Sequence, residues 1–131
     1  MSATTERVSN AIDELRETFP EAEVTCNPDG EGGAWVTIDQ VPLGPAFVQE
    51  TSWMAFQITH PYPEADVYPH FVRADLQRVD GNPHGEGFAV TSYGPQNVQA
   101  MQLSRRSNNL DPSVDTAASK ALKVLKWLGE R

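Results

Sequence analysis

Residues 52–79 constrain the fold of this chain more than any other segment, because they read as a strand, a proline-rich turn and a second strand. Met54, Phe56 and Ile58 alternate with smaller or polar residues, which is the period-two pattern of a strand. Prolines at positions 61, 63 and 69 fix φ and remove amide donors, so the connection is neither a helix nor a central strand. An apolar run restarts at Phe71. The segment therefore predicts two sheet strands joined by a rigid turn.

Two amphipathic helices are expected at the ends of the chain. The first covers residues 4–18, with Thr4 or Thr5 as its cap, Pro20 as its stop and an apolar stripe of Val8, Ile12, Leu15 and Phe19. The second is expected to begin at Asp111 and Pro112, which suit a helix cap and a first helical position. Its apolar stripe comprises Val114, Ala118, Ala121, Leu125 and Leu128.

Strand patterns lie between these helices. Residues 22–27 and 34–38 predict a hairpin around the turn at 27–30, residues 40–51 predict an irregular linker, and residues 53–59 and 70–76 predict two further strands. Residues 80–110 are rich in Gly, Asn, Pro and Ser and predict a long loop, of which residues 80–100 are expected to be mobile. The expected fold is a single α+β domain over residues 1–131: an N-terminal helix, a four-stranded antiparallel meander, a long loop and a C-terminal helix, with both helices on the sheet.

Composition excludes several classes of function. A net charge of −8 disfavours a nucleic-acid binder, because phosphate contacts need clustered Lys and Arg. No run approaches the roughly 18 apolar residues of a membrane span and no signal pattern opens the chain, so a cytoplasmic protein is expected. The single cysteine excludes an intrachain disulfide. His60, His70 and His84 match no compact ligand motif, so neither a metal nor another cofactor is expected.

Two sequence stretches carry a resemblance to a known family. Tyr62-Pro63 and Pro69 follow the central strand, and the stretch from Ser104 to Pro112 leads into the last helix. Over about residues 30 to 128 the chain resembles the ubiquitin-conjugating enzyme (UBC) superfamily, in its prokaryotic UBC-like family E branch. This resemblance implies a UBC-like fold in a bacterial ubiquitin-like conjugation system. The implied partners are a ubiquitin-like modifier, a ThiF-type activating enzyme or a JAB-type isopeptidase.

Tyr62 is a predicted structural and binding residue of this turn. An aromatic ring in a turn beside a sheet serves as an anchor, so we expect it to be largely buried with its hydroxyl bonded to backbone. A cis bond between Tyr62 and Pro63 is also expected, since tight turns favour that isomer.

The resemblance also implies a reactive cysteine, which the corresponding segment lacks. Conjugating enzymes pass an acyl group from a thiolate to an amine, and an Asn in a His-Pro-Asn motif stabilises the oxyanion. Here Asn82, Pro83 and His84 stand in reverse order, and the following residues 88–93 contain no cysteine. Thr91 or Ser92 could carry an oxyester with His84 as the base. A native cysteine replaced by engineering, for instance at Ala89, is another alternative.

Five further residues have both a functional and a structural interpretation. Cys26, the only thiol, is either a displaced nucleophile or a small hydrophobe buried in the first strand, and its strand position favours burial. Trp35 and Trp53 form either a binding platform or cross-strand packing. Arg105 and Arg106 either hold a carboxylate of a partner or neutralise acidic surface.

Three functions follow from these observations. The first is a catalytically silent adaptor or scaffold that binds the modifier or its enzymes, with Arg105, Arg106 and residues 82–93 as contact surface. The second is an acyl carrier that uses Thr91, Ser92 or Cys26. The third is a protein-interaction domain similar to RWD modules and unrelated to modifier transfer.

Overall fold

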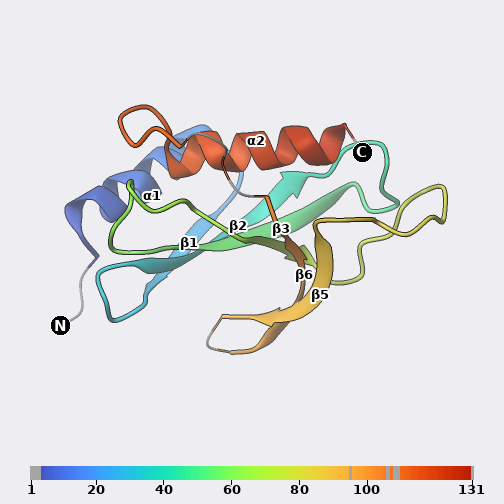
Figure 1. Ribbon diagram of the computed structural model, residues 1–131, viewed down its shortest axis with the longest axis horizontal. Helices are drawn as coiled ribbons and strands as arrows, with labels where there is room; N and C mark the ends of the chain where they lie inside the picture. Colours follow the sequence, from blue (N-terminus) through green and yellow to red (C-terminus); the bar gives the residue numbers. More distant parts are fainter. Residues whose placement is uncertain (1–3, 95, 106, 108–109, 131) are drawn as a thin grey trace.

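A layer of two helices covers one face of an antiparallel sheet (Figure 1). The computed structural model describes residues 4–94, 96–105, 107 and 110–130. Its helices are α1 (Glu6–Thr18) and α2 (Ala117–Gly129). Its strands are β1 (Val24–Pro28), β2 (Ala34–Pro42), β3 (Thr51–Ile58), β4 (His70–Arg73), β5 (Phe88–Tyr93) and β6 (Val98–Leu103). The mixed α+β class and the helices at both ends are as predicted.

The main core lies between the sheet and the helices. Paired residues of antiparallel strands share a face, so the register places alternate side chains of β2, β3, β4 and β6 under the helices. The fully buried members include Val36, Ile38, Met54, Phe56, Ile58, Val72 and Leu103. They meet Val8, Ile12 and Leu15 of α1 and Ala121, Val124 and Leu128 of α2. Burial of these apolar faces drives the two layers together.

The predicted long loop contains two strands, so the described residues form a sheet of six strands where the sequence predicts four. β5 and β6 form a hairpin, and the strand order in the sheet is β1-β2-β3-β4-β6-β5. The four predicted strands form the expected antiparallel meander, β1 to β4, and the hairpin extends it, because β4 pairs with β6 and β5 lies outside β6 at the edge. The alternating residues 88–93 and the turn residues after them carried this signal. The polar and glycine-rich composition of residues 80–110 favours a loop and outweighs this strand pattern in a prediction from sequence.

The second helix begins later than predicted. Asp111 accepts hydrogen bonds from the amide and hydroxyl of Ser113, at 3.0 and 2.6 Å, and so closes a separate turn. α2 starts at Ala117 behind the N-cap Thr116, whose hydroxyl accepts from the Ser119 amide at 3.1 Å. As a result Val114 lies outside the helix and is 69% exposed.

Tyr62 is the predicted anchor and is confirmed as one. Its ring is 8% exposed, and its hydroxyl oxygen accepts a hydrogen bond from the Ala117 amide at 3.0 Å. Ala117 is the first residue of α2, so the phenol satisfies one of the amides that a helix leaves without an internal partner. Burial raises the pKa of this phenol, although the Ala117 amide opposes the rise. The Tyr62–Pro63 bond is cis as predicted, and the Tyr68–Pro69 bond is cis as well.

Candidate functional site

The structure does not bring the predicted catalytic residues together. Thr91 shares the face of β5 that carries Tyr93, whereas Phe88 and its stacking partner His84 lie on the opposite face. Ser92 shares the Phe88 face but is four residues along the strand, about 13 Å at 3.3 Å per residue. His84 Nε2 instead shares a hydrogen bond with the Leu76 carbonyl at 2.8 Å. This arrangement provides no base beside either hydroxyl.

The other residues of the reversed motif also have structural partners. The exposed Asn82 donates a hydrogen bond from its backbone amide to the Asp80 carboxylate at 2.9 Å. His84 stacks on Phe88 with ring centroids 5.0 Å apart, and Phe88 stacks on Trp127 of α2 at 5.0 Å. These rings join residues 80–88 to the end of α2.

Arg105 belongs to the same stack. Its guanidinium carbon lies 4.9 Å from the centroid of the Trp127 ring, a cation–π arrangement. The side chain remains exposed, so a contact with a carboxylate stays a prediction. Arg106 lies outside the described residues.

Cys26 is half-buried in the structure, whereas the sequence predicts that it is buried in the sheet. It lies on β1, an edge strand, where it pairs with Val36 and packs against the main core. An edge position leaves one side of the strand uncovered, which explains the remaining exposure. The thiol faces the core side of the sheet, and the candidate site described next lies on the opposite face.

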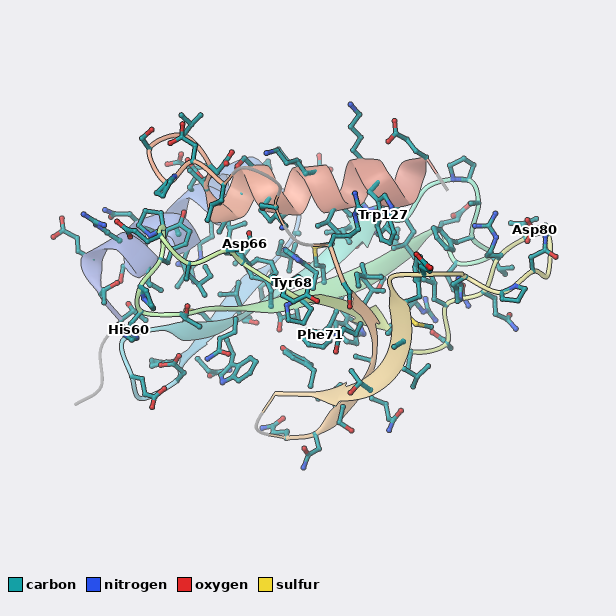
Figure 2. The ribbon with its side chains drawn as sticks, in the orientation of Figure 1. His60, Asp66, Tyr68, Phe71, Asp80 and Trp127 are labelled. Atoms are coloured by element: carbon teal, nitrogen blue, oxygen red, sulfur yellow. The ribbon has the colours of Figure 1, made fainter. Side chains whose placement is uncertain are left out.

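The helix-free face of the sheet carries an aromatic cluster. Figure 2 shows Phe71 on the side of the sheet away from α2. The β5–β6 hairpin curls over this face and sets Tyr93 among Trp35, Trp53 and Phe71, with ring centroids 5.7, 6.1 and 4.8 Å from its own. The Tyr93 hydroxyl also shares a hydrogen bond of 3.1 Å with the Thr37 hydroxyl of β2.

The sequence does not predict these Tyr93 contacts, although it offers Trp35 and Trp53 as a binding platform or as cross-strand packing. Tyr93 lies on β5 at the far edge of the sheet, and β6 and β4 stand between β5 and the strand β3 that carries Trp53. The signal that could have found it is the alternation of Thr91 and Tyr93 on one side of residues 88–93.

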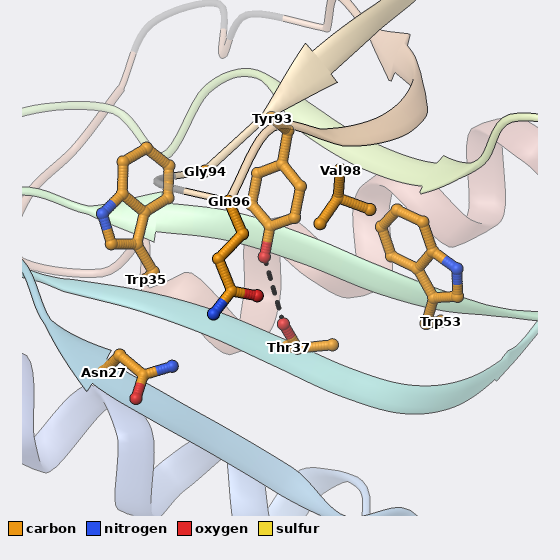
Figure 3. Close-up of a pocket in the computed structure, with 8 residues that line it drawn as sticks. All are labelled: Asn27, Trp35, Thr37, Trp53, Tyr93, Gly94, Gln96 and Val98. Atoms are coloured by element: carbon orange, nitrogen blue, oxygen red, sulfur yellow. Dashed lines mark hydrogen bonds between the residues drawn. The ribbon is translucent and has the colours of Figure 1, made fainter.

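A pocket of about 330 Å³ opens beside this cluster (Figure 3). Its walls come from β1, β2, β3 and the β5–β6 hairpin and consist mainly of aromatic rings and neutral polar side chains, with one glycine and one valine: Asn27, Trp35, Thr37, Trp53, Tyr93, Gly94, Gln96 and Val98. Tyr93 stands between the two indoles. The pocket therefore offers ring surfaces together with amide and hydroxyl groups, which is a composition suited to binding a ligand.

One carboxylate lies at the Trp35 end of this face. Asp29 Oδ2 accepts a hydrogen bond from the Gln57 side chain at 3.0 Å, and Gln57 is the cross-strand partner of Trp35. Burial alone would raise the pKa of Asp29, but hydrogen bonds from the Glu31 amide, Gln57 and the Gly33 amide outweigh it and lower the pKa. Asp29 therefore stays ionised, two residues along the chain from the pocket residue Asn27.

An ionic cluster of Asp66, Ser107 and Lys120 of α2 is partly buried elsewhere in the molecule, and Figure 2 shows its member Asp66 on the α2 side of the sheet. The Lys120 ammonium donates to both carboxylate oxygens of Asp66, at 3.2 and 3.1 Å, and to the Ser107 hydroxyl at 2.8 Å. Asp66 also accepts from the Ser107 amide and hydroxyl, at 2.7 and 2.8 Å. Burial lowers the pKa of Lys120 against the opposing effect of Asp66. These polar groups form hydrogen bonds with one another, so we interpret the cluster as a structural feature.

The described residues contain no group of three or more His, Cys, Asp or Glu side chains placed to hold a metal ion. Within the same part of the chain, no helix is long and apolar enough to cross a membrane. Comparison with protein-family models, with curated proteins and with solved structures finds no match to this chain.

Proposed function

We propose that this protein is a non-catalytic binding module whose helix-free sheet face holds a partner protein. The observation that carries the proposal is the pocket between Trp35, Trp53 and Tyr93. It combines partly exposed aromatic rings with amide groups. Its two hydroxyls, those of Thr37 and Tyr93, share a hydrogen bond with each other, and the described lining residues include no thiol and no His, Asp, Glu or Lys to act as a base. Aromatic side chains are enriched in protein interfaces because they contribute a large contact area at a small cost in side-chain entropy.

The proposed partners are components of a bacterial ubiquitin-like conjugation system in the cytoplasm. The helix–sheet–helix order and the Tyr62 anchor support a UBC-like fold, while the hairpin at 88–103 is an addition to the pattern expected from the resemblance. The absence of a cysteine from residues 80–110 supports an adaptor and not a carrier. The candidate partners are the ubiquitin-like modifier, a ThiF-type activating enzyme and a JAB-type isopeptidase.

A charging assay tests the non-catalytic part of this proposal. The chain is incubated with modifier, activating enzyme and ATP, and its intact mass is measured with and without reductant or alkali. We expect no added mass. A reducible adduct on Cys26, or an alkali-labile adduct on Thr91 or Ser92, would instead identify an acyl carrier.

A binding assay tests the surface. Each candidate partner is titrated into the wild-type protein and into Trp53→Ala, with Leu122→Ala as the matched control, because Leu122 is 49% exposed on α2. We expect Trp53→Ala alone to weaken binding, by tenfold or more, as for an aromatic residue central to an interface. Binding of none of the three would favour the RWD-like alternative, in which the partner is unrelated to modifier transfer.

A further inference from the structure

We propose that the pocket between Trp35, Trp53 and Tyr93 receives the cationic side chain of a lysine or arginine on an extended segment of the partner protein. This inference rests on the proposed function and specifies the chemistry that the pocket recognises. An aromatic ring attracts a cation to its negatively polarised face. Three rings meet here with Asn27, Thr37 and Gln96.

The distribution of charge around the pocket favours a cation. Residues 17–72, which supply β1, β2 and β3, contain acidic residues but no Lys or Arg, and residues 88–103 contain no charged residue at all. The ionised Asp29 accepts a hydrogen bond from Gln57, the cross-strand partner of Trp35, so its negative charge lies near the Trp35 end of the face. A cationic side chain entering the pocket would therefore meet negative potential and no competing ammonium or guanidinium from these elements.

Arg73, a cation on this face among the described residues, is paired with a carboxylate. Arg73 of β4 lies opposite Ala100, on the same face as the aromatic cluster. Its guanidinium donates to both carboxylate oxygens of Asp75, at 2.6 and 2.9 Å. A bidentate ion pair of this kind holds the guanidinium in place and neutralises it, so Arg73 does not oppose a second cation in the pocket.

The size and position of the pocket favour one side chain from an extended segment. About 330 Å³ lies at the lower end of the range of ligand pockets, which is room for a single long side chain. Asn27 of the pocket lies on β1, which ends the sheet and carries exposed residues along its length. An extended segment can lie along such an edge and direct alternate side chains to one face.

Titration with short peptides, followed by NMR of the tryptophan indole N–H groups, tests the inference. One capped pentapeptide has a central lysine flanked by serine and glycine, and its match has norleucine in place of lysine. We expect the lysine peptide to shift the signals of Trp35 and Trp53 and to bind about tenfold more tightly than the norleucine peptide. Trp127, on α2, is the internal control whose signal should not move.

Variants and a neutral ligand complete the test. Trp35→Leu should reduce lysine-peptide affinity by about tenfold, and Leu122→Ala should leave it unchanged, with thermal unfolding used to verify that both variants fold. Equal binding of the lysine and norleucine peptides, or a preference for a neutral trisaccharide, would contradict the inference that the pocket receives a cationic side chain. If partner binding still depended on Trp53 in that case, the proposed function would stand. If partner binding were indifferent to Trp53, the proposed function itself would fail.

Discussion

His70 shows at the residue scale how surroundings determine the chemistry of a side chain. The side chain is 0% exposed, its ring packs against Phe56 in a tilted arrangement at 5.0 Å between centroids, and neither ring nitrogen has a hydrogen-bond partner within the described structure. Burial, and next the positive charge of Lys120, lower the pKa of His70 to about 3, although Asp66 opposes the change. The imidazole is therefore neutral in the folded protein at ordinary pH.

We expect the free energy of unfolding to decrease as the pH falls from about 6.5 toward 3. In this window the unfolded chain binds a proton at His70 and the folded chain does not, so acid favours unfolding by up to about 1.4 kcal/mol per pH unit. Urea unfolding over this range measures the slope. His70→Leu should flatten it, whereas the exposed His60→Gln should retain it. A wild-type slope in His70→Leu would assign the effect to other groups.

The Asp66–Lys120 pair leads to a second prediction at this scale. We expect Asp66→Ala to reduce the free energy of unfolding by about 3 kcal/mol, because it leaves the enclosed Lys120 ammonium without its carboxylate. Adding Lys120→Met should restore most of the loss by removing the unpaired charge. The control is Glu64→Ala, since the Glu64–Arg7 pair is exposed and should change stability by less than about 1 kcal/mol. Equal effects of Asp66→Ala and Glu64→Ala in chemical denaturation would contradict the prediction.

At the scale of elements, α2 docks through a face slightly different from the predicted stripe. Val124 and Leu128 are buried at 2% and 0% exposure, while Leu125 is only half-buried. The stripe predicted from the sequence includes Leu125 as a buried residue, and by itself it predicts a large loss of folding stability for Leu125→Ala. The helix starts at Ala117, six residues after Asp111, so Val114 is not part of it. The face of α2 that is buried includes Ala121, Val124 and Leu128.

We therefore expect Leu128→Ala to cost about 2 to 5 kcal/mol, because it opens a cavity under α2. Leu125→Ala should cost less, and the exposed Leu122→Ala should have almost no effect. Thermal and urea unfolding of the three variants give the order. A larger loss for Leu125→Ala than for Leu128→Ala would show that the helix docks through the predicted stripe.

The β1–β2 hairpin provides another prediction for an element. A Cβ on Gly33 would lie 2.3 Å from the Ile58 carbonyl oxygen and 2.6 Å from Asp29 Oδ2. Gly33→Ala should therefore move the turn away from β3 and cost about 1 to 3 kcal/mol. Gly129→Ala is the matched control, since nothing lies within 4 Å of a Cβ there. The two variants should differ clearly in urea denaturation, and equal stabilities would show that the turn relaxes freely.

At the scale of the whole molecule, the described residues form two apolar clusters of unequal size, one on each face of the sheet. The larger lies beneath the helices, and the smaller contains Ala55, Phe71 and Ala100 with Trp53 and Tyr93 packed against them. The smaller cluster holds the curled β5–β6 hairpin over the sheet, so the pocket depends on it.

We expect Tyr93→Ala to loosen this hairpin without unfolding the helix layer. The variant loses three ring contacts and the hydrogen bond to Thr37, at about 1 kcal/mol for each ring contact. Hydrogen exchange should accelerate in β5 and β6 while the amides of β3 stay protected. Tyr93→Phe is the control, because it keeps the rings and loses only the hydroxyl. Equal acceleration throughout the sheet would show that the hairpin and the main core unfold together.

The sequence by itself determined the parts of this protein that depend on local pattern. The first helix, the strands around Val36 and Phe56, and the buried Tyr62 beside a cis proline bond follow from periodicity and proline chemistry. Each of these features involves residues close in the chain, so a short window contains the cause. The start of α2 was misplaced because Asp111 and Thr116 both suit a cap, and a window cannot choose between them.

Tertiary structure alone decided the candidate site. Tyr93 meets Trp35, Trp53 and Phe71 because β4 pairs with β6 and the β5–β6 hairpin bends over the sheet. The same topology separates Thr91 from His84 by placing them on opposite faces of β5. Pairing between strands distant in the chain leaves no fixed spacing in the sequence, because loop closure costs little more for a longer loop. Which aromatic rings form one pocket is therefore decided when the sheet assembles.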